Sequence, residues 1–164
     1  MKSFQQIWKQ MDATRRRQAA DALYAGKEYV GEQQRSVGVI AAKLNLRAQK
    51  AAKLPPEKLA GYLVSMVTPD EQLAGALVRA YLFGPHQAML VSFLDELQIP
   101  HEKGAISIEE VPPPSADALR AAVEKIRASF DATDVDIYLS ALLASDAGTW
   151  VNLENAGSAQ TQSE

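Results

Sequence analysis

The sequence contains no cysteine and only two histidines among its 164 residues. The absence of cysteine excludes disulfides, thiolate metal sites and a cysteine nucleophile, and it fits a reducing compartment. Aromatic residues make up only 7% of the chain. No apolar run approaches the roughly 18–20 residues that span a bilayer, and the opening MKSFQQIWKQ lacks the apolar core of a signal peptide. These absences predict a soluble, cytoplasmic protein without a membrane partner.

Sequence motifs that carry catalysis are also missing. The chain has no Gly-rich phosphate loop, no Gly-x-Ser-x-Gly elbow and no dinucleotide fingerprint. With so few histidines, general-base chemistry would fall to carboxylates, and the spacing fixes no pair of them in position. We therefore expect a protein that is not an enzyme and that needs no cofactor.

What the sequence does contain is helical periodicity, most strongly in residues 68–100. Thr68–Glu71 predicts a capping box at a helix start, Gly84–Pro85 ends that helix and opens the next, and Ile99–Pro100 stops the second one. We expect the apolar stripes of these two helices to face each other as a packed pair. The stripes are Leu73, Ala76, Leu77, Ala80 and Tyr81 in the first helix, and Met89, Leu90, Phe93, Leu94 and Leu97 in the second.

Weaker stripes predict five more helices, which gives about seven in all. They begin after Ser3, near Glu28, at Pro56, after Ser115 and at Thr133. The expected fold is all-α, a multi-helix bundle in one domain over residues 1–156, with an α-solenoid-like stack of helix pairs as the alternative. Residues 101–114 are expected to be a short irregular segment in which Ile106–Ile108 alternates like a strand. The polar residues 157–164 are expected to be a disordered tail.

Charge is unevenly distributed along the chain. Residues 1–53 hold 11 lysines and arginines against 4 acidic residues, whereas residues 54–164 hold 6 against 16. This asymmetry fits two surfaces that pack together, two subunits that meet head to tail, or a polyanionic partner.

The basic segment 35–53 is a candidate for nucleic-acid binding. Its apolar spacing, with Asn45 at a turn, is typical of a helix-turn-helix, although Pro55–Pro56 would leave the second helix barely two turns long. Cationic side chains on this segment could contact phosphates and base edges. The candidates are Arg35, Lys43, Arg47, Lys50 and Lys53.

A second alternative is a metal-dependent enzyme with a site near residues 95–102. Asp95, His101 and Glu102 are of ligand type for zinc or a harder divalent ion. Adjacent Asp95 and Glu96 diverge by about 100° on a helix, and no His-x-x-x-His or Glu-x-x-His pair is present. We therefore expect these side chains to be solvated or to tie the following loop to the helix end, with no metal bound.

Two stretches, FLDELQIPHEKGAI (residues 93–106) and YLSALLASDAGTW (residues 138–150), resemble a group of bacterial all-helical proteins of about this length. The early RRRQAADALY adds to this resemblance. The group has no activity that could be carried over, so the resemblance implies only a small, cytoplasmic, helical bacterial protein.

These observations favour a helical protein that acts through protein–protein contacts, either with a partner protein or by self-association as a homodimer. Apolar stripes on nearly every helix and the opposite charges of the two halves support this hypothesis. Nucleic-acid binding through the basic segment and a metal site near residue 100 remain the alternatives.

Overall fold

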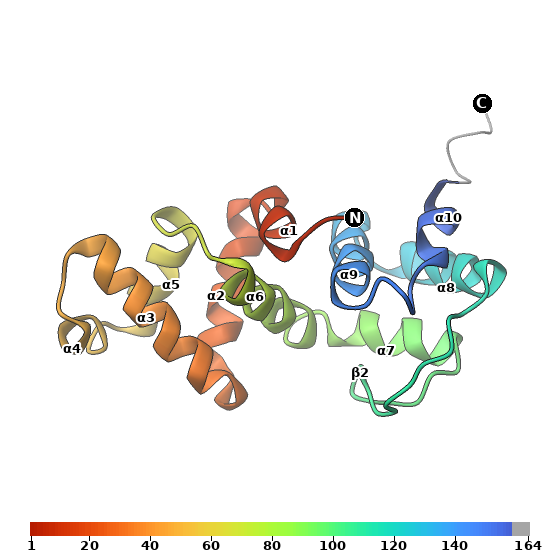
Figure 1. Cartoon of the computed structure of the whole chain (residues 1–164), viewed down its shortest axis with the longest axis horizontal. Coiled ribbons are helices and arrows are strands. Elements are labelled where there is room, and N and C mark those ends of the chain that lie inside the picture. Colours follow the sequence, from red (N-terminus) through yellow and green to blue (C-terminus); the bar gives the residue numbers. More distant parts are fainter. Residues whose placement is uncertain (159–164) are drawn as a thin grey trace. The chain divides into compact units, whose positions relative to one another are not determined.

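The computed structural model describes residues 1–158 (Figure 1). These residues form ten α-helices, one short 3-10 helix and one two-stranded hairpin, which confirms an all-α fold. The helices group into two compact units, called here the N-terminal unit (Ser3–Pro85) and the C-terminal unit (Met1–Lys2 with the chain from His86 onward). A single domain over residues 1–156 stays a prediction.

The N-terminal unit is built around α2, which packs against both α5 and α6, while α1 covers α6 and α3 contacts α4, α5 and α6 (Figure 1). Its core contains the fully buried side chains of Leu23, Ile40, Leu63 and Leu77. The elements are α1 (Phe4–Gln10), α2 (Ala13–Ala25), the 3-10 helix η1 (Lys27–Tyr29), α3 (Val30–Leu44), α4 (Ala48–Ala51), α5 (Pro56–Ser65) and α6 (Glu71–Phe83).

The N-terminus of α1 is capped by neighbouring side chains and by one side chain distant in sequence. Ser3 and Gln6 form a capping box at the predicted helix start. The carboxylate of Glu71 accepts hydrogen bonds from the backbone N–H groups of Phe4 at 2.8 Å and Gln5 at 3.1 Å. The capping box predicted for Thr68 and Glu71 is therefore wrong: Asp70 caps α6 instead, accepting from the N–H of Leu73 at 2.9 Å.

The helix count of about seven is too low because short polar residues break two predicted helices. Asp12 leaves the helical conformation and caps α2 by accepting from the N–H of Arg15, so the first helix becomes α1 and α2. Asn45 adopts the left-handed conformation, with φ 56°, and ends α3 before α4 begins. A tenth helix, α10, follows Trp150, and its first residues carry the chain back onto α8.

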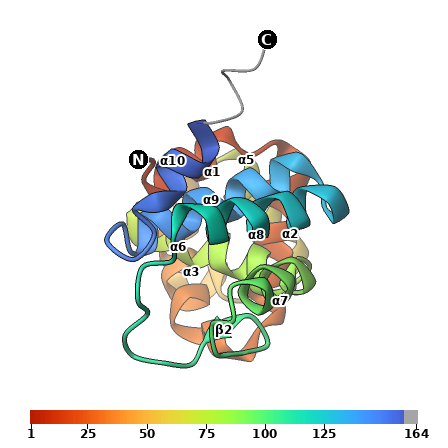
Figure 2. The ribbon, with the colours of Figure 1, turned by 90° about the vertical axis from the view of Figure 1, so that its right-hand side faces the viewer.

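In the C-terminal unit, α8 packs against α7, α9 and α10, and it lies between α7 and α10 in the view of Figure 2. Phe93 is fully buried at its centre, edge-on to Tyr138 with ring centroids 5.3 Å apart and tilted against Trp150 at 5.9 Å. Burial raises the pKa of the Tyr138 hydroxyl far above its usual value. The elements are α7 (Gln87–Glu96), β1 (His101–Glu102), β2 (Ala105–Ile106), α8 (Ala116–Ser129), α9 (Ala132–Ser145) and α10 (Asn152–Ser158).

The predicted pair at residues 68–100 consists of α6 and α7, which fall in different units. The stripe of α6 is buried against α1 and α2, and Met89, Leu90, Phe93 and Leu94 of the second stripe are buried in α7, which packs against α8. Leu97, the last residue of the second stripe, follows α7 and is half-buried. Apart from Leu97 the stripes are core, as expected, and each has packing partners within its own unit.

The segment expected to be irregular begins with an ordered hairpin. His101 pairs with Ile106 and Glu102 with Ala105, so the strand lies earlier than the predicted Ile106–Ile108. At the other end of the chain, α10 runs to Ser158, two residues into the stretch for which disorder is predicted. The rest of that stretch, residues 159–164, lies outside the described residues.

Candidate functional site

Four of the five basic candidates lie together at one corner of the N-terminal unit, called here the basic corner: Lys43, Arg47, Lys50 and Lys53. Lys43 is in the last turn of α3, Arg47 precedes α4, Lys50 is within it and Lys53 follows it. All four side chains are exposed, and none makes an ion pair within residues 1–158.

The fifth basic candidate, Arg35, is engaged elsewhere on α3. Its guanidinium lies 2.5 Å from the carboxylate of Asp70 and donates a second hydrogen bond to Gln72. The Leu73 N–H and this guanidinium hold the pKa of Asp70 below its usual value. Arg35 therefore ties α3 to the start of α6 within the N-terminal unit.

The basic segment 35–53 does not contain the recognition helix that the helix-turn-helix interpretation requires. Asn45 makes the expected left-handed turn, but α4 spans only four residues, Ala48–Ala51. Such a helix is too short to lay a row of side chains along a major groove. The cations of the basic corner are therefore placed to contact phosphates rather than base edges.

Two of the three metal-site candidates, Asp95 and His101, are engaged in hydrogen bonds. The Nε2 atom of His101 lies 2.7 Å from a carboxylate oxygen of Asp95, and its Nδ1 accepts a hydrogen bond from the Gly104 N–H at 3.1 Å. This network assigns the neutral tautomer protonated at Nε2 and leaves neither ring nitrogen for a metal. The side chain of Glu102 is exposed, and residues 1–158 contain no group of three or more His, Cys, Asp and Glu side chains that could hold an ion.

The other polar residues near the metal-site candidates also have local partners. Glu96 pairs with Lys125 of α8 at 3.1 Å. His86 lies 3.8 Å from Asp134 of α9. The predicted role of His101, to tie the loop to the helix end, agrees with its bonds to Asp95 and Gly104.

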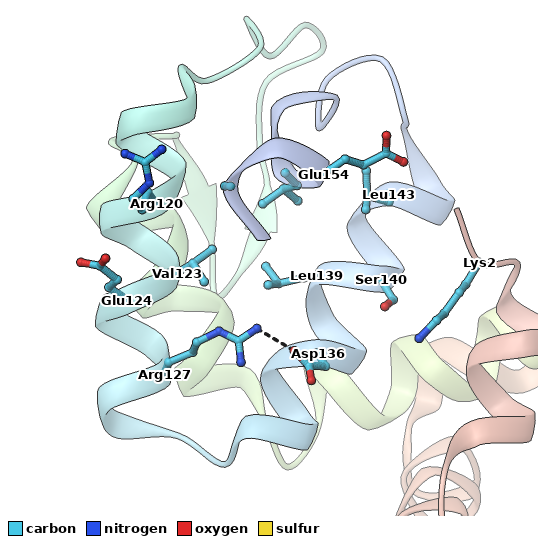
Figure 3. Close-up of a pocket in the computed structure, with 12 residues that line it drawn as sticks. Lys2, Arg120, Val123, Glu124, Arg127, Asp136, Leu139, Ser140, Leu143 and Glu154 are labelled. Atoms are coloured by element: carbon cyan, nitrogen blue, oxygen red, sulfur yellow. Dashed lines mark hydrogen bonds and ion pairs between the residues drawn. The ribbon is translucent and has the colours of Figure 1, made fainter. Parts of the chain in front are cut away.

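The C-terminal unit contains a groove that the sequence did not reveal (Figure 3). It has a volume of about 710 Å³ and is walled by helical side chains of α8, α9 and α10, with Lys2 at one end. We call it the α8–α10 groove. It is lined by Lys2, Arg120, Val123, Glu124, Arg127, Asp136, Leu139, Ser140, Leu143, Leu153, Glu154 and Ala156.

The α8–α10 groove has apolar side chains inside and charges of both signs around it. Leu139 and Leu143, one turn apart on α9, are half-buried and lie beside buried Val123 and Leu153. Arg127 of α8 bonds Asp136 of α9 at 2.7 Å, and this pair bridges the two walls (Figure 3).

The lining of the groove combines apolar side chains with the Ser140 hydroxyl and with charged groups of both signs. Neither histidine is among its lining residues. Apolar periodicity along α9 is the sequence signal nearest to this site. Leu139 and Leu142 fall in that periodic pattern, yet both remain half-buried, while Ile137 and Ala141 take buried positions on α9.

No protein-family model, no curated protein and no solved structure matches the chain. The resemblance to a group of bacterial helical proteins therefore stays a prediction. Among the described residues, no helix combines the length and the apolar character needed to cross a membrane.

Proposed function

We propose that this protein is not an enzyme and that it acts by binding another protein in the α8–α10 groove. The observation that carries the proposal is the apolar floor of that groove, where Leu139 and Leu143 stay half-buried between charged side chains. An apolar centre with a polar rim that includes arginine is the usual anatomy of a protein interface. The contacting partner surface would bury these leucines.

The partner segment that fits best is an amphipathic helix. The walls of the groove are helices, so they offer side chains and no open strand edge to which a β-strand could be added. Apolar residues of a helix at i, i+3 and i+4 can reach the floor, while its flanks meet charges of both signs. Cations such as Arg120 favour acidic flanking residues, and Glu124 favours basic ones.

Site-specific photo-cross-linking tests this proposal. A photoreactive amino acid replaces Ser140 inside the groove, in the organism that encodes the protein, and a control carries it at Val151, which is 50% exposed and does not line the groove. We expect one partner to be cross-linked from position 140 and not from position 151. Equal cross-linking from both positions would contradict the proposal.

Charged substitutions on the apolar floor of the groove should prevent the partner from binding. Leu139→Asp and Leu143→Asp place a carboxylate where the partner's apolar face would sit, so each should abolish the cross-link from position 140. Val151→Asp, the matched control, should leave it intact. A cross-link that survives both leucine changes would exclude the groove as the binding site.

Self-association is the form of this proposal in which the partner is a second copy. It predicts a cross-linked product of twice the chain mass and a concentration-dependent mass in light scattering at two salt concentrations. A strict monomer together with a cross-linked product of another mass would instead identify a different protein. The cytoplasmic location belongs to the same proposal, and cell fractionation tests it.

A further inference from the structure

The basic corner is a second surface without an assigned partner, and it lies in the N-terminal unit rather than at the α8–α10 groove. Between residues 33 and 69 the chain carries six lysines and arginines and a single carboxylate, Glu57. Four of these cations are the side chains of the basic corner, which are exposed and make no ion pair within residues 1–158. Surface cations that outnumber the carboxylates of their segment create a positive potential that attracts an anionic partner.

The basic corner is held on a packed scaffold. Ala51 of α4 and Ile40 of α3 are fully buried, and α3 contacts both α4 and α5. The left-handed turn at Asn45 fixes where α4 begins. The four cations therefore extend from defined backbone positions, which lowers the entropy that an anionic partner must overcome to engage them together.

We infer that the basic corner binds the phosphate backbone of a nucleic-acid duplex without reading its sequence. The four-residue helix α4 cannot supply the row of base contacts that specificity needs. Lysine and arginine, with the exposed amides of Asn45 and Gln49 beside them, are the side chains that contact phosphate oxygens.

The surroundings of the basic corner favour a duplex over other anionic partners. No aromatic residue occurs between Tyr29 and Tyr62, so the segment that carries the basic corner has no ring of its own on which unpaired bases could stack. Lysine is depleted and aromatic residues are enriched in protein interfaces, which is the reverse of this surface. Within residues 1–158, the exposed large apolar side chains all lie outside residues 43–53, so the corner offers no insertion point for a lipid bilayer.

A salt titration of the full-length protein tests the inference. Two fluorescein-labelled DNA duplexes of unrelated sequence, and an RNA duplex, are titrated by fluorescence anisotropy between about 50 and 200 mM salt. Neutralising about four phosphates gives a slope of log K against log salt of roughly −3 to −4, so affinity should fall roughly 100-fold over this range. Both DNA sequences should bind equally, and the tighter of DNA and RNA identifies the source of the phosphates.

Two charge variants assign the binding to the basic corner. The test variant combines Lys43→Gln, Arg47→Gln, Lys50→Gln and Lys53→Gln. The control variant removes four positive charges elsewhere, by Lys9→Gln, Lys27→Gln, Lys103→Gln and Lys125→Gln. All eight side chains are exposed, so both variants should keep the wild-type circular dichroism spectrum. Binding should be lost in the test variant and kept to within a few-fold in the control.

Several results would overturn the inference. They are the absence of duplex binding at the lowest salt, equal loss of binding in the two variants, tighter binding of a single strand than of the duplex, and tighter binding of anionic phospholipid vesicles or of polyglutamate. None of these results bears on the groove, since the cross-linking test uses residues of the C-terminal unit.

Discussion

His101 is a metal-ligand candidate whose side chain instead holds two elements of the fold together. Both of its ring nitrogens are occupied, one by the carboxylate of Asp95 and the other by the backbone N–H of Gly104. The ring thereby fastens the β1–β2 hairpin to the end of α7. A metal ion would have to displace one of these bonds, which explains why residue types alone are a poor guide to a metal site.

Phe93 gives the sharpest prediction for a single side chain. Because it is fully buried between Tyr138 and Trp150, Phe93→Ala removes a large apolar group and leaves a cavity. We expect a loss of about 3–5 kcal/mol in the free energy of unfolding, measured by urea denaturation. Phe130→Ala, at a half-buried ring in the same unit, is the matched control and should cost less. A loss below about 1 kcal/mol for Phe93→Ala would mean that the aromatic cluster does not hold the C-terminal unit together.

Gly38 in a helix and Gly104 in a turn should respond in opposite ways to substitution by alanine. Gly38 lies inside α3 with open space around its Cα, whereas Gly104 lies in the hairpin turn with φ +89°, where an added Cβ would come within 2.9 Å of the Leu90 Cβ. Gly38→Ala should therefore stabilise the protein by about 0.5–1 kcal/mol, since it removes backbone freedom from the unfolded chain. Gly104→Ala should destabilise it by about 1–3 kcal/mol through backbone strain and the clash with α7.

Thermal or urea unfolding of the two glycine variants measures this difference. Each carries the same chemical change, one added methyl group, so the sign of the effect reports the backbone conformation and the free space at each position. Stabilisation by Gly104→Ala would contradict the left-handed turn. Destabilisation by Gly38→Ala would mean that α3 is packed at that position.

Much of the helical pattern could be predicted because it follows from local chemistry. Ser3 and Ser115 cap helices as expected, and Gly84 ends α6. The break at Asp12 was not predicted, and the break at Asn45 was predicted only by the helix-turn-helix alternative, because an apolar stripe continues in phase across a short interruption. The capping of α1 by Glu71 joins residues far apart in sequence, so no local pattern could reveal it.

The basic corner and the α8–α10 groove also differ in how far they could be predicted from the sequence. The cations of the basic corner were predicted by residue type, since they lie within 11 consecutive residues, but the length of α4 was not. The α8–α10 groove was missed because it is formed by side chains of three helices, which are separated by residues 130–131 and by the turn at residues 146–151. Only their packing decides that Leu139 and Leu143 remain half-buried.

The fluorescence of the two tryptophans can report whether the two units unfold together. Trp8 is 2% exposed in the N-terminal unit, and Trp150 is 2% exposed in the C-terminal unit. A chain of this length is expected to form one domain, and each unit alone would bury a smaller fraction of its surface. We therefore expect a single cooperative transition for both units.

Single-tryptophan variants test this expectation. Trp8→Phe leaves Trp150 as the only fluorescent reporter, and Trp150→Phe leaves Trp8. Within each variant, the urea transition followed by tryptophan fluorescence should coincide with that followed by far-ultraviolet circular dichroism, because all helices then unfold together. If fluorescence of Trp150 changes while about half of the helical signal remains, the units unfold separately and the chain contains two domains. The comparison is made inside each variant, so the stability lost through either substitution does not affect it.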